Sequence, residues 1–249
     1  LCFKIFNMKL LNFLILTLGI ILLFSCRKNV TSETSDIPQD TVKGNWKMEG
    51  WMGKWKFEPY SPDDTLSVYI EIIDTISSTS KPSVKISNGI NEISIDTMYC
   101  YPSGYYRYCY KYGDYPTSFY RRNTLYSLEV KIDANKYLKG YFYTPNIDSI
   151  KIISPDSVPK NTSFTIRWQF FGVPSSYDSL YLGIGTFYTT CLEIFLPGNT
   201  TQYTTTLIDP CKNSDTILIG VGYIRKKIFV DTTKRFYSYV YRLRPFKTY

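Results

Sequence analysis

Alternation of apolar and polar residues is the feature of this sequence that most limits its fold. Every second side chain is aliphatic from Leu66 to Ile72, and the same period runs from Tyr126 to Ile132. A period of two indicates half-buried β-strands, whereas no ten-residue stretch outside 10–24 has a convincing 3.6-residue helical period. Alanine, the best helix former, occurs once, while aromatic residues make up 17% of the chain. These features predict an all-β protein.

The folded part is predicted to begin near residue 44, with a tryptophan-rich strand at 45–57. Trp46, Trp51 and Trp55 are expected in the core, and Gly50 and Gly53 suggest a β-bulge. Further along, the Asp-Ala-Asn turn at 133–135 is expected to join the strand before it to the strand that follows, as a hairpin.

A proline-rich stretch at 144–161 predicts a boundary between two domains, 44–146 and 147–249. After it, Phe164, Ile166, Trp168 and Phe170 fall on one face of a strand. Together with strand patterns at 200–210 and 215–224, this half resembles a fibronectin type III or immunoglobulin-like sandwich. The resemblance implies a core position for Trp168 and carries no activity. We expect two β-sandwich domains.

The N-terminal stretch is typical of a targeting segment. Lys9 precedes a predominantly apolar stretch of fifteen residues, Leu10–Phe24, which is shorter than the ~20 residues that a membrane-spanning helix needs. The sequence Leu-Phe-Ser-Cys at 23–26 resembles the lipobox of bacterial lipoproteins. That resemblance implies a signal peptide at 8–25, cleavage before Cys26 and lipids on Cys26; an ordinary cleaved signal or anchor is the alternative.

Lipidation would place the protein in the cell envelope, at the outer membrane, with residues 26–43 as a flexible tether. Arg27 and Lys28 stand where surface-exported lipoproteins of Bacteroidota usually carry acids, so the periplasmic and surface faces both stay open. The two-domain layout also resembles small lipoproteins of Bacteroidota, some encoded beside outer-membrane nutrient transporters, through the strands at 126–133 and 140–152.

The composition excludes several classes of function. The chain has no histidine, which removes Ser-His-Asp catalysis and histidine-based zinc sites. Its net charge of +8 suggests acidic polymers or lipid headgroups as partners, and not nucleic acid; a solvated basic surface is the simpler interpretation. Asp63 and Asp64 could suggest a calcium site, but two adjacent carboxylates in a proline-rich segment are interpreted as a turn. No metal or cofactor site is predicted.

Four cysteines remain after Cys2 and Cys26, and four cysteines allow three pairings. One local bridge in each half is the simplest arrangement, Cys100–Cys109 and Cys191–Cys211, and an oxidising compartment favours it. The first pair gains support from a hairpin turning at Gly104, where a type II′ turn prefers glycine.

That hairpin would place both cysteines on one face and four tyrosines on the other, with Pro102 at a sheet edge. The opposed pairs are Tyr99 with Tyr110 and Tyr101 with Tyr108. Stacked tyrosines can hold sugar rings or an acidic glycan, or they can cover the sheet and pack on a neighbour. The cations expected to flank them are Arg107, Lys111, Arg121 and Arg122.

Aspartate followed by Ser or Thr and then a small or aliphatic residue or threonine occurs nine times. This tripeptide resembles the O-glycosylation motif of Bacteroidota. Strand chemistry offers a second explanation, because Asp favours turns and Ser or Thr with an aliphatic residue opens strands. The residues that would be modified are Thr41, Thr65, Thr75, Thr97, Ser149, Ser157, Ser179, Thr216 and Thr232.

The sequence therefore predicts a non-catalytic envelope lipoprotein that binds a partner protein or glycan, with an accessory role at an outer-membrane transporter as a more specific version. A glycan-binding module that uses the tyrosine hairpin is the alternative. A glycoside hydrolase with two carboxylates is a third hypothesis. Its candidates, Glu49, Glu58, Glu71 and Glu129, form no recognisable signature.

Overall fold

The computed structural model describes residues 38–58, 64–75, 81–96, 98–229 and 232–249. Among these residues the regular structure is almost entirely β-strand, with two single-turn 3₁₀ helices, η1 (Thr117–Phe119) and η2 (Cys211–Asn213). No helix in this part of the chain has the length and apolar character required to cross a membrane. The prediction of an all-β protein is confirmed.

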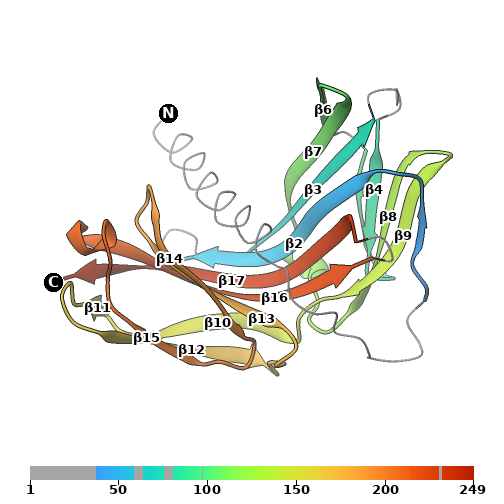
Figure 1. The fold of residues 1–249 in the computed structure, drawn as a ribbon. Helices are drawn as coiled ribbons and strands as arrows, with labels where there is room; N and C mark the ends of the chain where they lie inside the picture. Colours follow the sequence, from blue (N-terminus) through green and yellow to red (C-terminus); the bar gives the residue numbers. More distant parts are fainter. Residues whose placement is uncertain (1–37, 59–63, 76–80, 97, 230–231) are drawn as a thin grey trace.

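The largest sheet runs through the whole molecule and mixes strands from both halves of the chain (Figure 1). Its order is β14-β13-β16-β17-β2-β3-β7-β6, and β11 pairs in parallel with β17. The bounds are β2 (Lys47–Phe57), β3 (Thr65–Thr75), β6 (Tyr99–Ser103), β7 (Tyr106–Tyr115), β11 (Ser157–Val158), β13 (Ser179–Gly185), β14 (Thr190–Pro197), β16 (Thr216–Ile228) and β17 (Lys234–Thr248).

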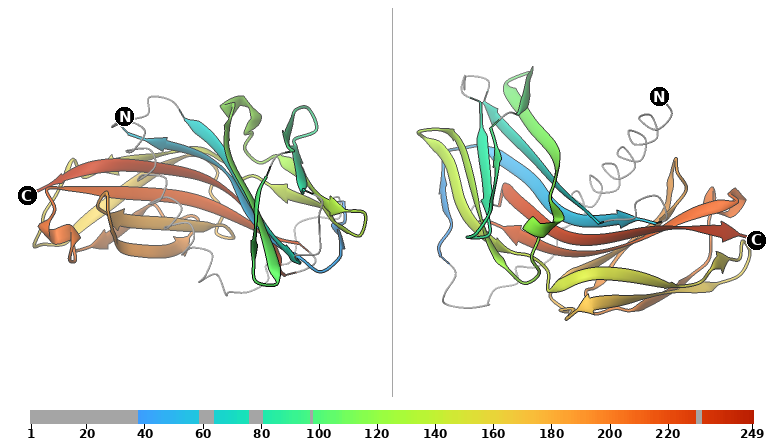
Figure 2. Two further views of the ribbon diagram at one scale, coloured as in Figure 1. Left: turned by 90° about the horizontal axis from the view of Figure 1, so that it is seen from above. Right: turned by 180° about the vertical axis from the view of Figure 1, so that it is seen from behind.

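Two smaller sheets form second layers against this large sheet. The five-stranded sheet, β1-β9-β8-β4-β5, belongs to the first half, and the three-stranded sheet, β10-β12-β15, belongs to the second. The bounds are β1 (Thr41–Lys43), β4 (Ser83–Ser87), β5 (Glu92–Ile95), β8 (Leu125–Asp133), β9 (Lys136–Tyr143), β10 (Ile147–Ser154), β12 (Phe164–Gly172) and β15 (Gln202–Thr205). The further views in Figure 2 show the large sheet extending from the C-terminus to the β6–β7 hairpin, which rises at the far end.

A parallel pairing between β2 and β17 joins the two halves of the chain. Its register runs from Met48 opposite Lys234 to Phe57 opposite Leu243. The predicted boundary at residue 147 coincides with the start of β10 and separates the two second layers. The large sheet continues across it, because the last strand of the chain pairs with the first long one.

The core lies between the large sheet and its two second layers, and it forms one continuous cluster of buried side chains. On β17, Phe236 packs on Phe142 of β9 with ring centroids 4.5 Å apart. Farther along the same strand, the Arg242 Nε donates to the Ile150 carbonyl of β10 at 2.8 Å. Trp168 is 2% exposed, as the resemblance to a sandwich implied. One long strand thus contributes to both layers.

Three local predictions differ from the structure. The predicted tether 26–43 includes β1, in which Val42 lies opposite Leu138 of β9. The expected bulge at Gly50 and Gly53 is wrong, because β2 keeps an unbroken register with both β3 and β17. Trp51 is buried, as predicted, but in a second cluster on the outer face of the large sheet and not in the main core. The signal 8–25 and Cys26 lie outside the described residues.

Candidate functional site

The tyrosine hairpin forms as predicted, at the edge of the large sheet. β6 and β7 place Cys100 opposite Cys109, and Gly104 turns the chain with a φ of 60°. The two cysteines form a disulfide with their Cα atoms 4.1 Å apart. Pro102 lies on the edge strand β6, where the N–H that proline lacks is not needed for a hydrogen bond between strands.

The four tyrosines opposite the disulfide form a stacked surface that we call the tyrosine ladder: Tyr99, Tyr101, Tyr108 and Tyr110. Tyr101 stacks on Tyr108 with ring centroids 5.7 Å apart and an interplanar angle of 12°. Tyr99 and Tyr110 lie 5.8 Å apart. Tyr99 is 66% exposed and Tyr101 is 51% exposed, so the ladder presents aromatic faces to the surroundings.

The basic residues expected around the ladder are only partly brought to it. Lys111 lies over the Tyr99 ring, with its Nζ 5.4 Å from the centroid. Arg107 is buried and lies 3.8 Å from the Asp74 carboxylate on the inward side, so its prediction as a flanking cation is wrong. Arg121 and Arg122 occupy the loop between η1 and β8.

The ladder continues across the large sheet into charged residues that sequence reasoning did not connect with it. Tyr110 lies opposite Glu71 of β3, and Glu71 lies opposite Glu49 of β2. Glu49 in turn lies opposite Arg235 of β17. The alternation of side chains in each strand predicts that Glu49 and Glu71 face outward. Only the order of the strands shows that they form one row with Tyr99.

The two carboxylates in this row have different surroundings. The Tyr69 hydroxyl donates a hydrogen bond to Glu71 at 2.7 Å. Oε1 of Glu49 is buried and has no hydrogen-bond partner in the described structure. Burial raises the pKa of Glu49; the nearby Arg235 lowers it, and the charge of Glu71 raises it further. Glu49 is therefore a carboxyl that an additional hydrogen-bond donor would stabilise.

A cavity of about 270 Å³ lies at this end of the row. It contains charged side chains of both signs, because Lys47 and Arg235 line it together with Glu49 and Glu71. The other lining residues are Met48, Ile73, Thr232 and Thr233. The arrangement provides hydrogen-bond donors and acceptors in one hollow beside an aromatic surface.

A second row of aromatic side chains supports the site on the outer face of the large sheet. Trp51 stacks on Tyr69 at 5.9 Å and contacts Tyr112 at 6.0 Å. Tyr239 packs on Trp51 at 5.4 Å and lies over Gly53, where a Cβ would come within 2.0 Å of its ring. The glycine first interpreted as a bulge thus allows a tyrosine ring to lie flat on the sheet.

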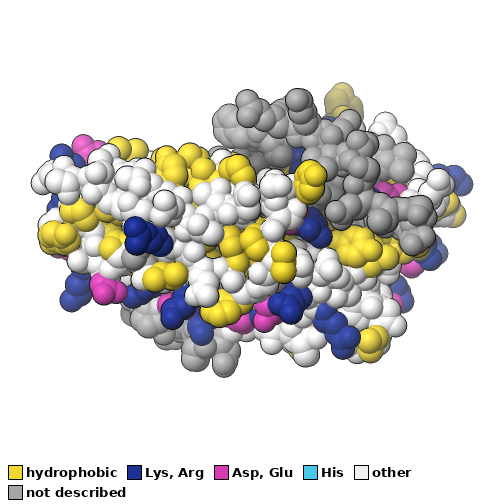
Figure 3. Space-filling view, turned by 90° about the horizontal axis from the view of Figure 1, so that it is seen from below, with side chains coloured by type: hydrophobic (Ala, Val, Ile, Leu, Met, Phe, Trp, Pro, Cys, Tyr) yellow, Lys and Arg dark blue, Asp and Glu magenta, His cyan; other side chains and the backbone are white. Residues whose placement is uncertain are grey.

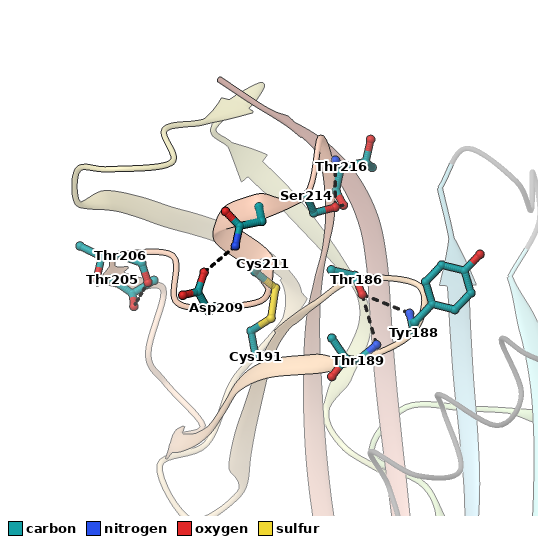
Figure 4. The surroundings of a disulfide bond; sticks show 11 residues. Thr186, Tyr188, Thr189, Cys191, Thr205, Thr206, Asp209, Cys211, Ser214 and Thr216 are labelled. Atoms are coloured by element: carbon teal, nitrogen blue, oxygen red, sulfur yellow. Dashed lines mark hydrogen bonds between the residues drawn. A yellow bond between two sulfur atoms is a disulfide. The ribbon is translucent and has the colours of Figure 1, made fainter.

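The second predicted disulfide also forms (Figure 4). It involves β14, which lies at the end of the large sheet opposite to β6. Cys191 of β14 bonds to Cys211 of η2, with Cα atoms 6.1 Å apart. Asn213 donates to the Asp209 carboxylate at 2.9 Å within the same loop. This bridge ties the β15–β16 connection to an edge strand and lies far from the ladder in the large sheet.

Seven of the nine aspartates of the recurring tripeptide form ion pairs within the described residues. Asp178 accepts two hydrogen bonds from Arg225, and Asp40 pairs with Lys227 at 2.8 Å. Similar ion pairs involve Asp64, Asp74, Asp148, Asp156 and Asp215. The pairs of the buried carboxylates of Asp40, Asp74 and Asp178 give these aspartates a role in the fold that is independent of modification.

The Ser and Thr residues of the tripeptide mostly stand where strands start. The first residues of their strands are Thr41, Thr65, Ser157, Ser179 and Thr216. Thr75 ends β3, Ser149 lies within β10, Thr232 precedes β17, and Thr97 lies outside the described residues. Strand-opening chemistry therefore accounts for much of the repetition, while Thr41, Thr75, Ser179 and Thr232 are exposed enough to be modified.

The other glutamates considered for catalysis lie apart from this row. Glu129 of β8 pairs with Lys139 at 3.1 Å on an exposed face of the five-stranded sheet. Glu58 lies 3.5 Å from Arg242. Asp64 pairs with Lys54 at 3.0 Å, and Asp63 lies outside the described residues. Within the described ranges, no group of three or more Cys, Asp or Glu residues is arranged to hold a metal ion.

The distribution of basic side chains can be seen on one face of the molecule. In the view of Figure 3, lysine and arginine side chains are scattered among hydrophobic and uncharged ones. This distribution is typical of a solvated basic surface, the simpler of the two interpretations of the net charge.

No protein-family model and no curated protein matches this chain. Among solved structures, the chain is similar to the crystal structure of an ICAM-5 D1–D4 ectodomain fragment, with 9% sequence identity and a TM-score of 0.26. The match covers 85% of this chain and spans about half, 53%, of the ICAM-5 fragment.

Proposed function

We propose that this protein is a non-catalytic, lipid-anchored module of the cell envelope that binds a partner through the tyrosine ladder. The observation that carries the proposal is the exposure of ordered, paired aromatic rings on a disulfide-linked hairpin. Tyr99 and Tyr101 are both more than half exposed, yet their rings are held against Tyr110 and Tyr108. Rigid tyrosines provide large contact areas with little loss of side-chain entropy on binding.

The sheet framework supports a binding function. β7 is paired along its length with β3, and β3 with β2, so the ladder stands on the continuous large sheet. The disulfide between Cys100 and Cys109 joins the two strands that carry the rings. Such a surface is held in its binding geometry before a partner arrives, which reduces the entropic cost of association.

Anchoring through Cys26 is the second part of the proposal. It rests on the lipobox-like sequence, and it places the folded chain at a membrane surface, with the outer membrane as the expected one. A role as accessory subunit of an outer-membrane transporter is the more specific version. Mass spectrometry of the native protein tests the anchor: a peptide beginning at Cys26 with added acyl mass is expected, and an unmodified Cys26 contradicts it.

In-cell photo-crosslinking tests the binding surface. A photoreactive residue replaces Tyr101 in the full-length protein, and in a matched variant it replaces Tyr177, which is 73% exposed and lies outside the ladder. A discrete crosslinked product, protein or glycan, is expected from position 101 and not from 177. Equal products from both positions, or none from position 101, would contradict the proposed surface.

A further inference from the structure

We propose that the cavity at Glu49, Glu71 and Arg235 binds an uncharged sugar residue, and that the tyrosine ladder holds the rest of the same glycan. The inference rests on the proposed function and names the chemical class of its ligand. It also extends the site from one hairpin to five strands of the large sheet.

The charges that line the cavity cancel. Lys47 and Arg235 contribute two positive charges, and the two glutamates contribute two negative ones. A cationic ligand would face the guanidinium of Arg235, and an anionic ligand would face the carboxylate of Glu71, so either sign meets an unfavourable neighbour. A neutral ligand avoids this cost and can still form charge-assisted hydrogen bonds with both kinds of group.

The polar groups of the cavity require a ligand that both donates and accepts hydrogen bonds. Oε1 of Glu49 is buried without a donor, and a ligand hydroxyl would satisfy it. Arg235, Lys47 and the hydroxyl of Thr232 can donate to the oxygen atoms of the same ligand. Each sugar hydroxyl can donate and accept hydrogen bonds at once, without carrying a charge.

The aromatic and polar parts of the site lie along one continuous line. Tyr99, Tyr110, Glu71, Glu49 and Arg235 occupy directly opposed positions on five neighbouring strands. Neighbouring strands are about 4.8 Å apart, so the line extends over ~19 Å. A chain of sugar rings can place its C–H faces on the tyrosines and its hydroxyls among the charged residues.

The cavity size and its fixed groups match one sugar residue within a longer glycan. At about 270 Å³, the cavity is smaller than the ~300–1,000 Å³ typical of drug-sized ligands. The hydrogen bond from Tyr69 holds Glu71 in place, and Tyr69 is itself stacked on Trp51. The second aromatic row therefore fixes the orientation of Glu71 at the charged end of the line.

Calorimetric titration of the full-length lipidated protein in detergent tests the inference. The probes are a neutral panel of cellohexaose, maltohexaose, mannohexaose and xylohexaose, with a chitosan hexamer as the cationic probe and a mannuronate hexamer as the anionic one. The variants are Glu49→Gln, Glu71→Gln and Tyr101→Ala. Matched controls are Glu129→Gln, an exposed glutamate on the other sheet, and Tyr177→Ala, an exposed tyrosine outside the ladder.

We expect at least one neutral oligosaccharide to bind more tightly than either charged probe. Each of the three site variants is expected to weaken that binding by about tenfold, the effect of losing one charge-assisted hydrogen bond or one stacking contact. The two control variants are expected to bind within twofold of the unmodified protein. Release of new reducing ends in the same mixtures would contradict the non-catalytic assignment.

Three outcomes overturn the inference: no neutral probe binds, a charged probe is preferred, or Glu49→Gln and Glu71→Gln leave the affinity unchanged. The proposed function is judged separately by the crosslink from position 101. A protein crosslinked at the ladder without any binding of neutral sugars would keep the binding surface and reject the sugar site. Absence of both would reject the two proposals together.

Discussion

Glu49 and Glu71 lie directly opposite each other on adjacent antiparallel strands, and only Glu71 receives the hydrogen bond from Tyr69. Glu49 keeps a buried carboxylate oxygen without a partner, and burial raises its pKa. The folded protein therefore binds the proton of the Glu49 carboxyl more tightly than the unfolded chain does. Protonation of Glu49 stabilises the fold, and this contribution is complete below the pKa that Glu49 has in the unfolded chain. It is lost as the pH rises through the raised, folded pKa.

Replacing Glu49 by glutamine is therefore expected to stabilise the protein at pH 7. Removing an unsatisfied buried charge contributes on the order of 1 kcal/mol, which corresponds to about 2–4 °C in Tm for a chain of this size. The pH dependence of Tm above pH 4.5 should also become flatter. Differential scanning calorimetry at several pH values checks both effects, with Glu129→Gln as the exposed control; a lower Tm for Glu49→Gln at pH 7 contradicts the assignment.

Gly53→Ala is expected to destabilise the protein because the Tyr239 ring lies over the glycine. A Cβ at residue 53 would come within 2.0 Å of that ring, which is itself buried. Overpacking of this kind costs about 1–3 kcal/mol. Urea unfolding should show most of that loss for Gly53→Ala, and a much smaller added loss when Tyr239→Ala is already present. Equal losses of stability in the two backgrounds would show that the Tyr239 ring is not what excludes a side chain at residue 53.

Asp178→Asn is expected to destabilise the fold strongly, whereas Asp215→Asn is expected to have little effect. Asp178 is buried and accepts two hydrogen bonds from the partly buried Arg225, so breaking the pair removes two charge-assisted hydrogen bonds, at a cost of about 1.5–3 kcal/mol. Asp215 pairs with Lys160 but is 98% exposed, and such pairs contribute ~0–1 kcal/mol.

The same two variants help to separate the explanations for the recurring tripeptide. Both are produced without the native host's modification, so any difference in thermal unfolding reports the role of each aspartate in the fold. Intact mass of protein from the native host then tests the modification itself. A mass equal to that of the bare lipidated chain would reject glycosylation at Thr41, Ser179 and the other sites.

Removing either disulfide is expected to lower stability by an amount that follows the length of the loop it closes. The bridges span sequence separations of 9 and 20 residues, for which loop-closure entropy predicts ~2.5 and ~3.3 kcal/mol. For each bridge, a variant with both cysteines replaced by serine is compared by urea unfolding. The variant that lacks the Cys191–Cys211 bridge should lose more stability than the one that lacks Cys100–Cys109. Peptide mapping without reduction checks the pairing, and a peptide joining Cys100 to Cys191 or Cys211 would contradict it.

The two halves of the chain are expected to depend on each other for folding. A fragment ending at residue 146 leaves β2 without β17, and a fragment starting at 147 leaves β17 with an open edge. Unpaired edges of long apolar strands favour aggregation. Expressed alone, each fragment should be poorly soluble, and co-expression should restore a soluble complex; two soluble monomeric fragments would show that the shared sheet is dispensable.

The local features of this protein follow from its sequence. The alternation of side chains over 66–72 and 126–132 predicts strands because a period of two places one face in the core. The hairpin register follows from glycine at residue 104 and from period-two geometry. It pairs Cys100 with Cys109 and stacks the four tyrosines without any information from the rest of the chain.

The order of strands in the large sheet was decided only by the tertiary structure. β2 and β17 lie at opposite ends of the sequence, and local patterns do not encode which distant strands pair in parallel. That pairing brings Arg235 beside Glu49 and completes the row from Tyr99 to the cavity. The sequence alone thus determined the strands and the tyrosine ladder. Long-range packing of aromatic and apolar faces decided the sheet order, and with it the charged end of the site.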